Sequence, residues 1–200
     1  MKALSDALLG FLAGFVITLG ATAYLSLEST MAGALMFTVG LFAICSFGWN
    51  GFLAVVWISN FAGAAAGGAL IRLTRLEGVV SRAQAVAATK LDDGLLSVFV
   101  LAIFCNVLIY IAVEGYRSIE NSLGRYLAVF FGVTVFVVCG FEHCVANMYY
   151  FTAAGAWSGE AIVFILVNTL GNALGGLLVP ALTLLSRKCA ALSQKSDSLR

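Results

Sequence analysis

Long stretches without a single charged side chain divide this sequence. No Asp, Glu, Lys or Arg occurs within residues 7–27, 29–71, 94–113 or 161–186. A helix that crosses the apolar core of a bilayer needs roughly 20 apolar residues, and each run has about that length or a multiple of it. A soluble domain needs a charged surface, about a quarter of its residues, whereas only 10% of these 200 residues are charged. The sequence therefore predicts a polytopic membrane protein.

Hydropathy predicts six membrane helices, joined by short loops and by one charged connector at about residues 73–93. The predicted helices cover residues 7–25, 31–47, 52–72, 94–113, 126–150 and 160–186. The last two segments exceed a single crossing and contain Gly, Asn and Ser, which favours helices that are interrupted or closely packed. The first uncharged run is longer than the apolar part of a signal peptide, so we expect a membrane helix there.

The distribution of Lys and Arg predicts the orientation. With an even number of crossings, both termini share one side. That side receives Lys2, Arg117, Arg125, Arg187, Lys188, Lys195 and Arg200, and the other receives Arg72, Arg75, Arg82 and Lys90. The excess favours cytoplasmic termini, although the connector is also basic. We expect one channel domain over residues 1–200 in the inner (plasma) membrane, with a cytoplasmic tail at residues 188–200.

Two blocks of sequence recur in the same order in the two halves of the chain. They pair residues 37–47, FTVGLFAICSF, with 131–141, FGVTVFVVCGF, and residues 60–70, NFAGAAAGGAL, with 168–178, NTLGNALGGLL. Halves of three helices each, about residues 1–76 and 90–187, must have opposite orientations in the membrane. Such inverted repeats are typical of transporters and channels, whose sites lie where both halves interrupt their helices. The alternative is chance similarity between Gly-rich apolar segments.

Three polar side chains, Glu142, His143 and Asn147, fall inside the fifth apolar run. Each costs a few kcal/mol at such depth unless it is buried in protein or lines a cavity. Backbone N–H groups freed by a helix break near Gly140 would suit Glu142 as an acceptor. A histidine, with an ordinary pKa of about 6.5, can exchange protons with a weak acid. We therefore expect His143 to face a pore; the alternative is a histidine satisfied within the core.

The first half carries a possible second interruption and two further polar candidates. The equivalent stretch holds Gly48, Trp49, Asn50 and Phe52. Glycines around an amide indicate a helix break, but a tight turn between the second and third helices fits equally well. Lys90, just before the fourth apolar run, is either a site residue or an interfacial lysine. Asn106, in the middle of that run, is more typical of contact between helices.

Other classes of function find little support in the sequence. A net charge of +1 gives no electrostatic basis for nucleic-acid binding. The five cysteines contain no CxxC pair, so we expect apolar packing and neither a metal nor a disulfide framework. An enzyme or membrane-embedded sensor would need more convergent groups than the single acid–base pair Glu142 and His143. We predict no enzymatic activity, no metal site and no cofactor.

GFEHCVANM at residues 140–148 resembles the GFEHSVANM signature of the formate/nitrite transporter family, with Cys144 in place of the usual serine. Three other stretches are similar to motifs of the family's second, fourth and sixth helices. They are FTVGL at residues 37–41, LAIFCNVLIYIAV at 101–113 and LGNALGG at 170–176. The resemblance covers nearly the whole chain, and the stretch at 140–148 is highly specific.

This resemblance implies an all-α membrane fold, aquaporin-like, with six transmembrane helices in two inverted three-helix repeats and with helices 2 and 5 broken. It implies a pore in each protomer of a homopentamer. His143 would be the central pore histidine, Lys90 the lysine that concentrates anions, and Glu142 the anchor of the pore loop. The other implied residues are Asn106 and Asn172 beside the pore, the constriction residues Phe37, Leu41 and Phe136, and the pore-loop residues Cys144 and Asn147.

The expected function is a channel or transporter for small monovalent anions such as formate or nitrite, with protonation or proton co-transport at His143. Its expected partners are the small anionic solute, protons and the lipid bilayer. The chain also departs from the family pattern. Gly51-Phe52-Leu53 replaces the usual Leu-Phe-Thr, the segment after the first break is nearly absent, and only six residues precede the first run, too few for the family's N-terminal amphipathic helix. The alternative is a channel for another small solute such as hydrosulfide, ammonia or urea.

Overall fold

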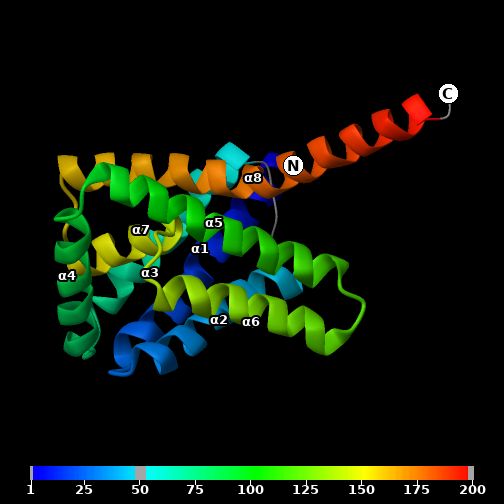
Figure 1. The fold of residues 1–200 in the computed structure, drawn as a ribbon. Coiled ribbons are helices and arrows are strands. Elements are labelled where there is room, and N and C mark those ends of the chain that lie inside the picture. Colours follow the sequence, from blue (N-terminus) through cyan, green and yellow to red (C-terminus); the bar gives the residue numbers. More distant parts are fainter. Residues whose placement is uncertain (1, 48–52, 198–200) are drawn as a thin grey trace.

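The computed structural model describes residues 2–47 and 53–197, and within these ranges the chain forms eight α-helices (Figure 1). They are α1 (Lys2–Ser26), α2 (Thr30–Phe47), α3 (Leu53–Ile71), α4 (Glu77–Leu91), α5 (Leu95–Ser118), α6 (Ser122–Val138), α7 (Cys144–Ala154) and α8 (Gly159–Asp197). α6 and α7 together form one crossing and α4 forms none. The described chain therefore makes the six predicted crossings.

The length and composition of the helices fit a bilayer. Ala3–Ser26, Leu95–Ser118 and Gly159–Leu192 are each long and apolar enough to cross a membrane. The shorter apolar helices include Thr30–Ser46, whose 17 residues extend over about 25 Å at 1.5 Å per residue, close to the hydrocarbon thickness of about 30 Å. Many large apolar side chains on these helices are exposed, as lipid-facing residues must be. The protein is a membrane protein.

The two halves of the bundle pack in the same way. α1 contacts α2 and α3, just as α5 contacts α6 and α8, and α2 meets α6 between the halves. α1 runs towards the end that carries α4 whereas α5 runs away from it, so the halves have opposite orientations (Figure 1). Gly63 of α3 and Gly171 of α8, which correspond in the repeat, each lie against the backbone of a neighbouring helix, where a Cβ atom would clash. Small residues therefore set the close packing of both halves.

The fifth crossing is interrupted beside Gly140, at the predicted place. Gly140 has a φ of +69°, its N–H donates to the Val137 oxygen (3.1 Å), and the Phe141 N–H donates to the Phe136 oxygen (2.9 Å). This is a Schellman turn, which satisfies the last carbonyls of α6 and needs a residue that tolerates positive φ. The helix resumes as α7 at Cys144, which leaves a short non-helical loop inside the bundle.

The predicted interruption of the second helix lies outside the described residues. Gly48, Trp49, Asn50 and Phe52 all fall between the end of α2 at Phe47 and the start of α3 at Leu53.

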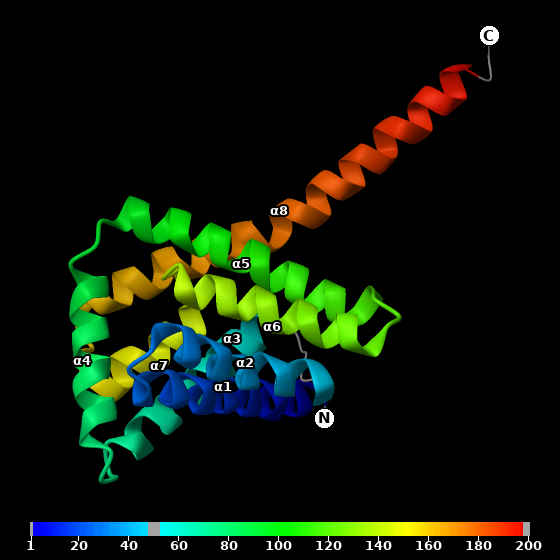
Figure 2. The ribbon, with the colours of Figure 1, turned by 60° about the horizontal axis from the view of Figure 1, so that its bottom comes forward.

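The charged connector at residues 73–93 proved to contain a helix that hydropathy did not predict. α4 lies across one end of the bundle, at a steep angle to the membrane helices (Figure 2). Its buried side chains are Val79, Ala83 and Ala87, which recur every four residues and therefore form one face. Hydropathy missed this helix because its other faces are charged and polar. Its position at the bundle end is that of an interfacial amphipathic helix.

The start of α1, the α5–α6 turn and the end of α8 all lie on the side away from α4 (Figures 1 and 2). Six of the seven basic residues assigned to the terminal side belong to these segments, the seventh, Arg200, lies outside the described residues, and the other four belong to the α4 side. α8 was predicted to end near residue 186 but continues to Asp197 and projects beyond the bundle. Most of the expected tail at residues 188–200 is therefore helical.

Candidate pore site

The Glu142 carboxylate is the electrostatic centre of the break loop. Its Oε2 accepts a hydrogen bond from Lys90 Nζ at 2.6 Å and another from Asn147 Nδ2 at 2.6 Å. The side chains of Glu142 and Lys90 are only 5% and 14% exposed. Asn147 Nδ2 also donates to Asn168 Oδ1 at 2.9 Å. A buried carboxylate is costly unless it is both paired and hydrogen-bonded, and this one is both.

Two buried asparagines of α8 hold the backbone of the same loop. Asn168 Nδ2 and Asn172 Nδ2 donate to the Glu142 carbonyl oxygen at 2.9 and 2.8 Å. Asn172 Oδ1 accepts from the Cys144 N–H at 2.9 Å, and its Nδ2 also donates to the Ala102 oxygen at 2.8 Å. These bonds satisfy backbone groups of the break in the absence of helical partners, as a membrane interior requires.

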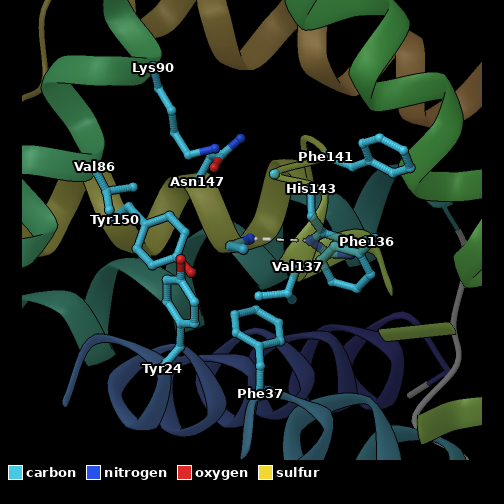
Figure 3. Close-up of a pocket in the computed structure, with 12 residues that line it drawn as sticks. Tyr24, Phe37, Val86, Lys90, Phe136, Val137, Phe141, His143, Asn147 and Tyr150 are labelled. Carbon is cyan, nitrogen blue, oxygen red and sulfur yellow. Dashed lines mark hydrogen bonds between the residues drawn. The ribbon is translucent and has the colours of Figure 1, made fainter. Parts of the chain in front are cut away.

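The ring of His143 caps α7 and also faces the cavity. The Ala146 N–H donates to His143 Nδ1 at 3.3 Å, the bond drawn as a dashed line in Figure 3. Because Nδ1 is the acceptor, the neutral ring carries its proton on Nε2. The ring also stacks on Phe136, with centroids 5.8 Å apart and an interplanar angle of 22°. His143 can therefore offer an Nε2–H donor from a fixed orientation.

A cavity of about 60 Å³ lies beside the break loop. It is lined by Tyr24, Phe37, Val86, Lys90, Phe136, Val137, Gly140, Phe141, His143, Ala146, Asn147 and Tyr150 (Figure 3). This volume suits a few water molecules or a solute of similar size. Lys90 enters from α4, whereas Phe37 approaches from α2 on the opposite side (Figure 3). Lys90 and Phe37 thus lie on opposite sides of the cavity, and the ring of His143 lies beside that of Phe136 (Figure 3).

Two phenylalanines, one from each half of the chain, close the apolar side of the cavity. Phe37 of α2 and Phe136 of α6 are almost fully buried and meet edge to face, with centroids 5.8 Å apart at 86°. Leu41, the third predicted constriction residue, lies one turn along α2 and packs partly buried against the core. It does not line the cavity described above.

The structure brings most of the predicted site residues to one place. Phe37, Lys90, Phe136, His143 and Asn147 line the cavity. Three others, Glu142, Cys144 and Asn172, do not line the cavity. They belong to the hydrogen-bond network that holds the break loop. Asn106 does not line the cavity either. Its Nδ2 donates to the Asn172 carbonyl oxygen at 2.8 Å.

Several cavity and network residues were not anticipated from the sequence. The sequence could have identified Asn168, because it begins the second repeated block and corresponds to Asn60 in the first. Val86 was hidden because α4 was not predicted. Tyr24 and Tyr150 had no signal, since an aromatic residue in an apolar run is most often packing or lipid-facing. The described residues also contain no group of three His, Cys, Asp or Glu side chains placed to hold a metal ion.

Residues 49–186 match the sequence model of the formate/nitrite transporter family. The chain belongs to this family. The matched range includes the break loop, α4 and both asparagines of α8. The family is one of transporters rather than enzymes, as the sequence predicted.

Curated relatives match part of the chain. The uncharacterized transporter YrhG of Bacillus subtilis (strain 168) is 35% identical over 113 residues, which are 54% of this chain and 42% of the relative. The formate-nitrite transporter of Plasmodium knowlesi (strain H) is 32% identical over 102 residues, which are 48% of this chain and 32% of the relative. The chain therefore spans less than half the length of either relative.

Solved structures match almost the whole fold. One is a pentameric formate channel with formate bound, with a TM-score of 0.83 at 22% identity, covering 94% of this chain and 98% of that one. Another is an FNT family ion channel, with a TM-score of 0.74 at 21% identity, covering 93% of this chain and 89% of that one. This similarity confirms the predicted all-α channel fold.

Proposed function

We propose that this protein is a channel or transporter for small monovalent anions of weak acids, with formate and nitrite as the first candidates. Family membership supports transport, and one structure with the same fold binds formate. The observation that carries the proposal is the meeting of an ammonium group, an imidazole and two phenyl rings around one cavity at a helix break.

The donor side of the cavity suits an anion. The Lys90 ammonium has three N–H donors, and its bond to Glu142 uses one of them. His143 adds its Nε2–H from a fixed ring. Lys90 and His143 therefore both offer hydrogen-bond donors to an anion in the cavity. A neutral solute such as ammonia or urea gains less from the ammonium, which ranks these alternatives below an anion.

The phenyl side of the cavity is the barrier. A bare anion loses its hydration between Phe37 and Phe136 at a high cost, whereas the neutral acid crosses an apolar constriction cheaply. The proton comes from water or through His143. Transfer through the ring requires protonation of Nδ1 before Nε2 releases its proton. That step displaces the hydrogen bond from Ala146, so proton transfer and the cap of α7 are coupled.

We also propose the assembly and orientation of the channel. A homopentamer with one pore in each protomer is supported by the similar pentameric channel and by the exposed apolar side chains of the bundle. The larger number of basic residues on the side of the termini supports cytoplasmic termini in the inner (plasma) membrane. We further propose that the chain forms one channel domain, with halves at residues 1–76 and 90–187.

Uptake of labelled formate and of nitrite by proteoliposomes across a pH series tests the proposal. We expect uptake above that of empty liposomes, rising as the pH falls and lost in Lys90→Ala. Lys188→Ala is the matched control, because Lys188 is exposed on the projecting part of α8 and its loss should leave uptake unchanged. Competition with hydrosulfide, ammonia and urea ranks the alternatives. A folded protein that carries no small anion would contradict the proposal.

A further inference from the structure

Two hollows continue from the pore cavity towards the surface beside α4. The first has a volume of about 140 Å³ and shares Tyr24 and Val86 with the pore cavity. The second is wider, about 610 Å³, and shares Leu25, Glu28 and Arg82 with the first. The shared walls place the three spaces in a row, from the break loop to the gap between the α1–α2 turn and the first half of α4.

One side of α4 runs along this row. Arg82, Val86 and Lys90 are spaced four residues apart and therefore lie on the same side of the helix. Arg82 lines both outer hollows, Val86 lines the two inner spaces, and Lys90 lines the pore cavity. The row thus has a cation near its outer part, an apolar residue in its middle and a second cation at its inner end.

The two cations differ in how far their charge is balanced. Lys90 forms an ion pair with Glu142 at 2.6 Å, which offsets much of its attraction for an incoming anion. Among the described residues, no carboxylate lies within ion-pair distance of Arg82, whose Nη1 donates instead to the oxygens of Leu25 (3.1 Å) and Leu27. These carbonyl oxygens hold the Arg82 guanidinium in place. A guanidinium has five N–H donors in a planar arrangement that matches the two oxygens of a carboxylate.

We infer that Arg82 forms an outer binding site for the transported anion, a small planar oxyanion of the carboxylate or nitrite type. This inference rests on the proposed function and adds a second binding position to it. The exposed Glu28 lines both hollows that Arg82 lines, whereas Arg75 lines the outer one alone. The side chains of the outer hollow therefore carry two positive charges and one negative charge, and those of the first hollow carry one of each. From Arg82 the anion passes between Tyr24 and Val86, the residues common to both inner spaces (Figure 3).

Electrostatic capture at Arg82 has a kinetic signature. A cation beside a narrow opening raises the local anion concentration, and added salt screens this effect. In proteoliposomes we expect Arg82→Gln to raise the half-saturating formate concentration several-fold at low ionic strength, with the maximal rate unchanged and the salt dependence weakened. Arg82→Lys should retain part of the effect. Arg75→Gln, which removes an exposed arginine from the outer hollow alone, should change much less.

A binding measurement separates this inference from the proposed function. Nitrite or formate should raise the melting temperature of the purified protein, because a ligand stabilises the state that binds it. We expect Arg82→Gln to reduce this rise. Val86→Trp, which narrows the passage, should block uptake and preserve the rise. If Arg82→Gln matches the wild type in half-saturation, salt dependence and anion-induced stabilisation, the outer site is wrong. Absent uptake with intact anion binding at Arg82 would refute transport alone.

Discussion

Lys90 at the end of α4 and Glu142 in the break of the fifth crossing form an ion pair of 2.6 Å between elements 52 residues apart in the sequence. The pair joins an interfacial helix to the non-helical loop that lines the cavity. It also explains how a carboxylate persists inside the bundle, since its charge is balanced and its oxygen is hydrogen-bonded. The ion pair therefore couples the position of the Lys90 side chain to the conformation of the loop.

Removal of one partner of this pair should cost more stability than removal of both. Lys90→Met leaves the Glu142 carboxylate buried without its cation, which typically costs about 3–5 kcal/mol. The double variant Lys90→Met, Glu142→Gln leaves no charge and should recover most of the melting temperature, while uptake stays lost. Thermal unfolding of the purified variants measures this. Equal stability of the single and double variants would show that the pair is not energetically coupled.

The two repeated asparagines should respond differently to the same substitution. Asn168 donates to the Glu142 carbonyl, which also accepts from Asn172, and it accepts from Asn147. Asn168→Leu therefore removes one of two donors to this carbonyl and leaves one N–H of the Asn147 amide buried without a partner, at about 1–3 kcal/mol. Asn60 is its counterpart, and its buried Oδ1 has no hydrogen-bond partner among the described residues. Asn60→Leu should therefore be neutral or stabilising. Melting temperatures test this contrast, and equal losses would contradict it.

The break at Gly140 could be predicted because the sequence conflicts with an uninterrupted membrane helix at that point. A glycine followed by an acid and a histidine inside an apolar run cannot be placed in lipid without satisfied polar groups, so a loop inside protein was the reasonable solution. The inverted repeat could also be predicted, because its two blocks contain the small residues that both halves need for close helix packing, such as Gly63 and Gly171. These features are local in sequence or repeated within it.

The features that escaped prediction depend on tertiary contacts. α4 has too little apolar surface for hydropathy, and only its burial against the bundle selects the face formed by Val79, Ala83 and Ala87. The partner of Lys90 was not predictable, since nothing in the sequence brings residue 90 to residue 142. Leu41 lies one turn along α2 from Phe37 and does not line the cavity described above, so its place in a constriction stays a prediction.

Phe136 should set the upper size of the solutes that pass. Phe136→Ala removes the ring that meets Phe37 edge to face and supports His143. We expect larger monocarboxylates to be taken up and the preference for small anions to fall. Phe131→Ala is the control, because Phe131 lies on the same helix but is 58% exposed on its outer side. Uptake of an anion series of increasing size distinguishes the variants, and identical size limits would remove Phe136 from the constriction.

Substitutions of His143 can separate its capping role from its role towards the anion. His143→Asn keeps an N-cap acceptor for the Ala146 N–H, whereas His143→Ala loses it at a cost of about 1 kcal/mol. The asparagine variant should therefore melt close to the wild type, and the alanine variant lower. Neither variant can relay a proton, so both should lose the rise of formate uptake at falling pH. If His143→Asn retains the full pH dependence, the proton reaches the anion from water, and the imidazole serves only as a cap and a hydrogen-bond donor.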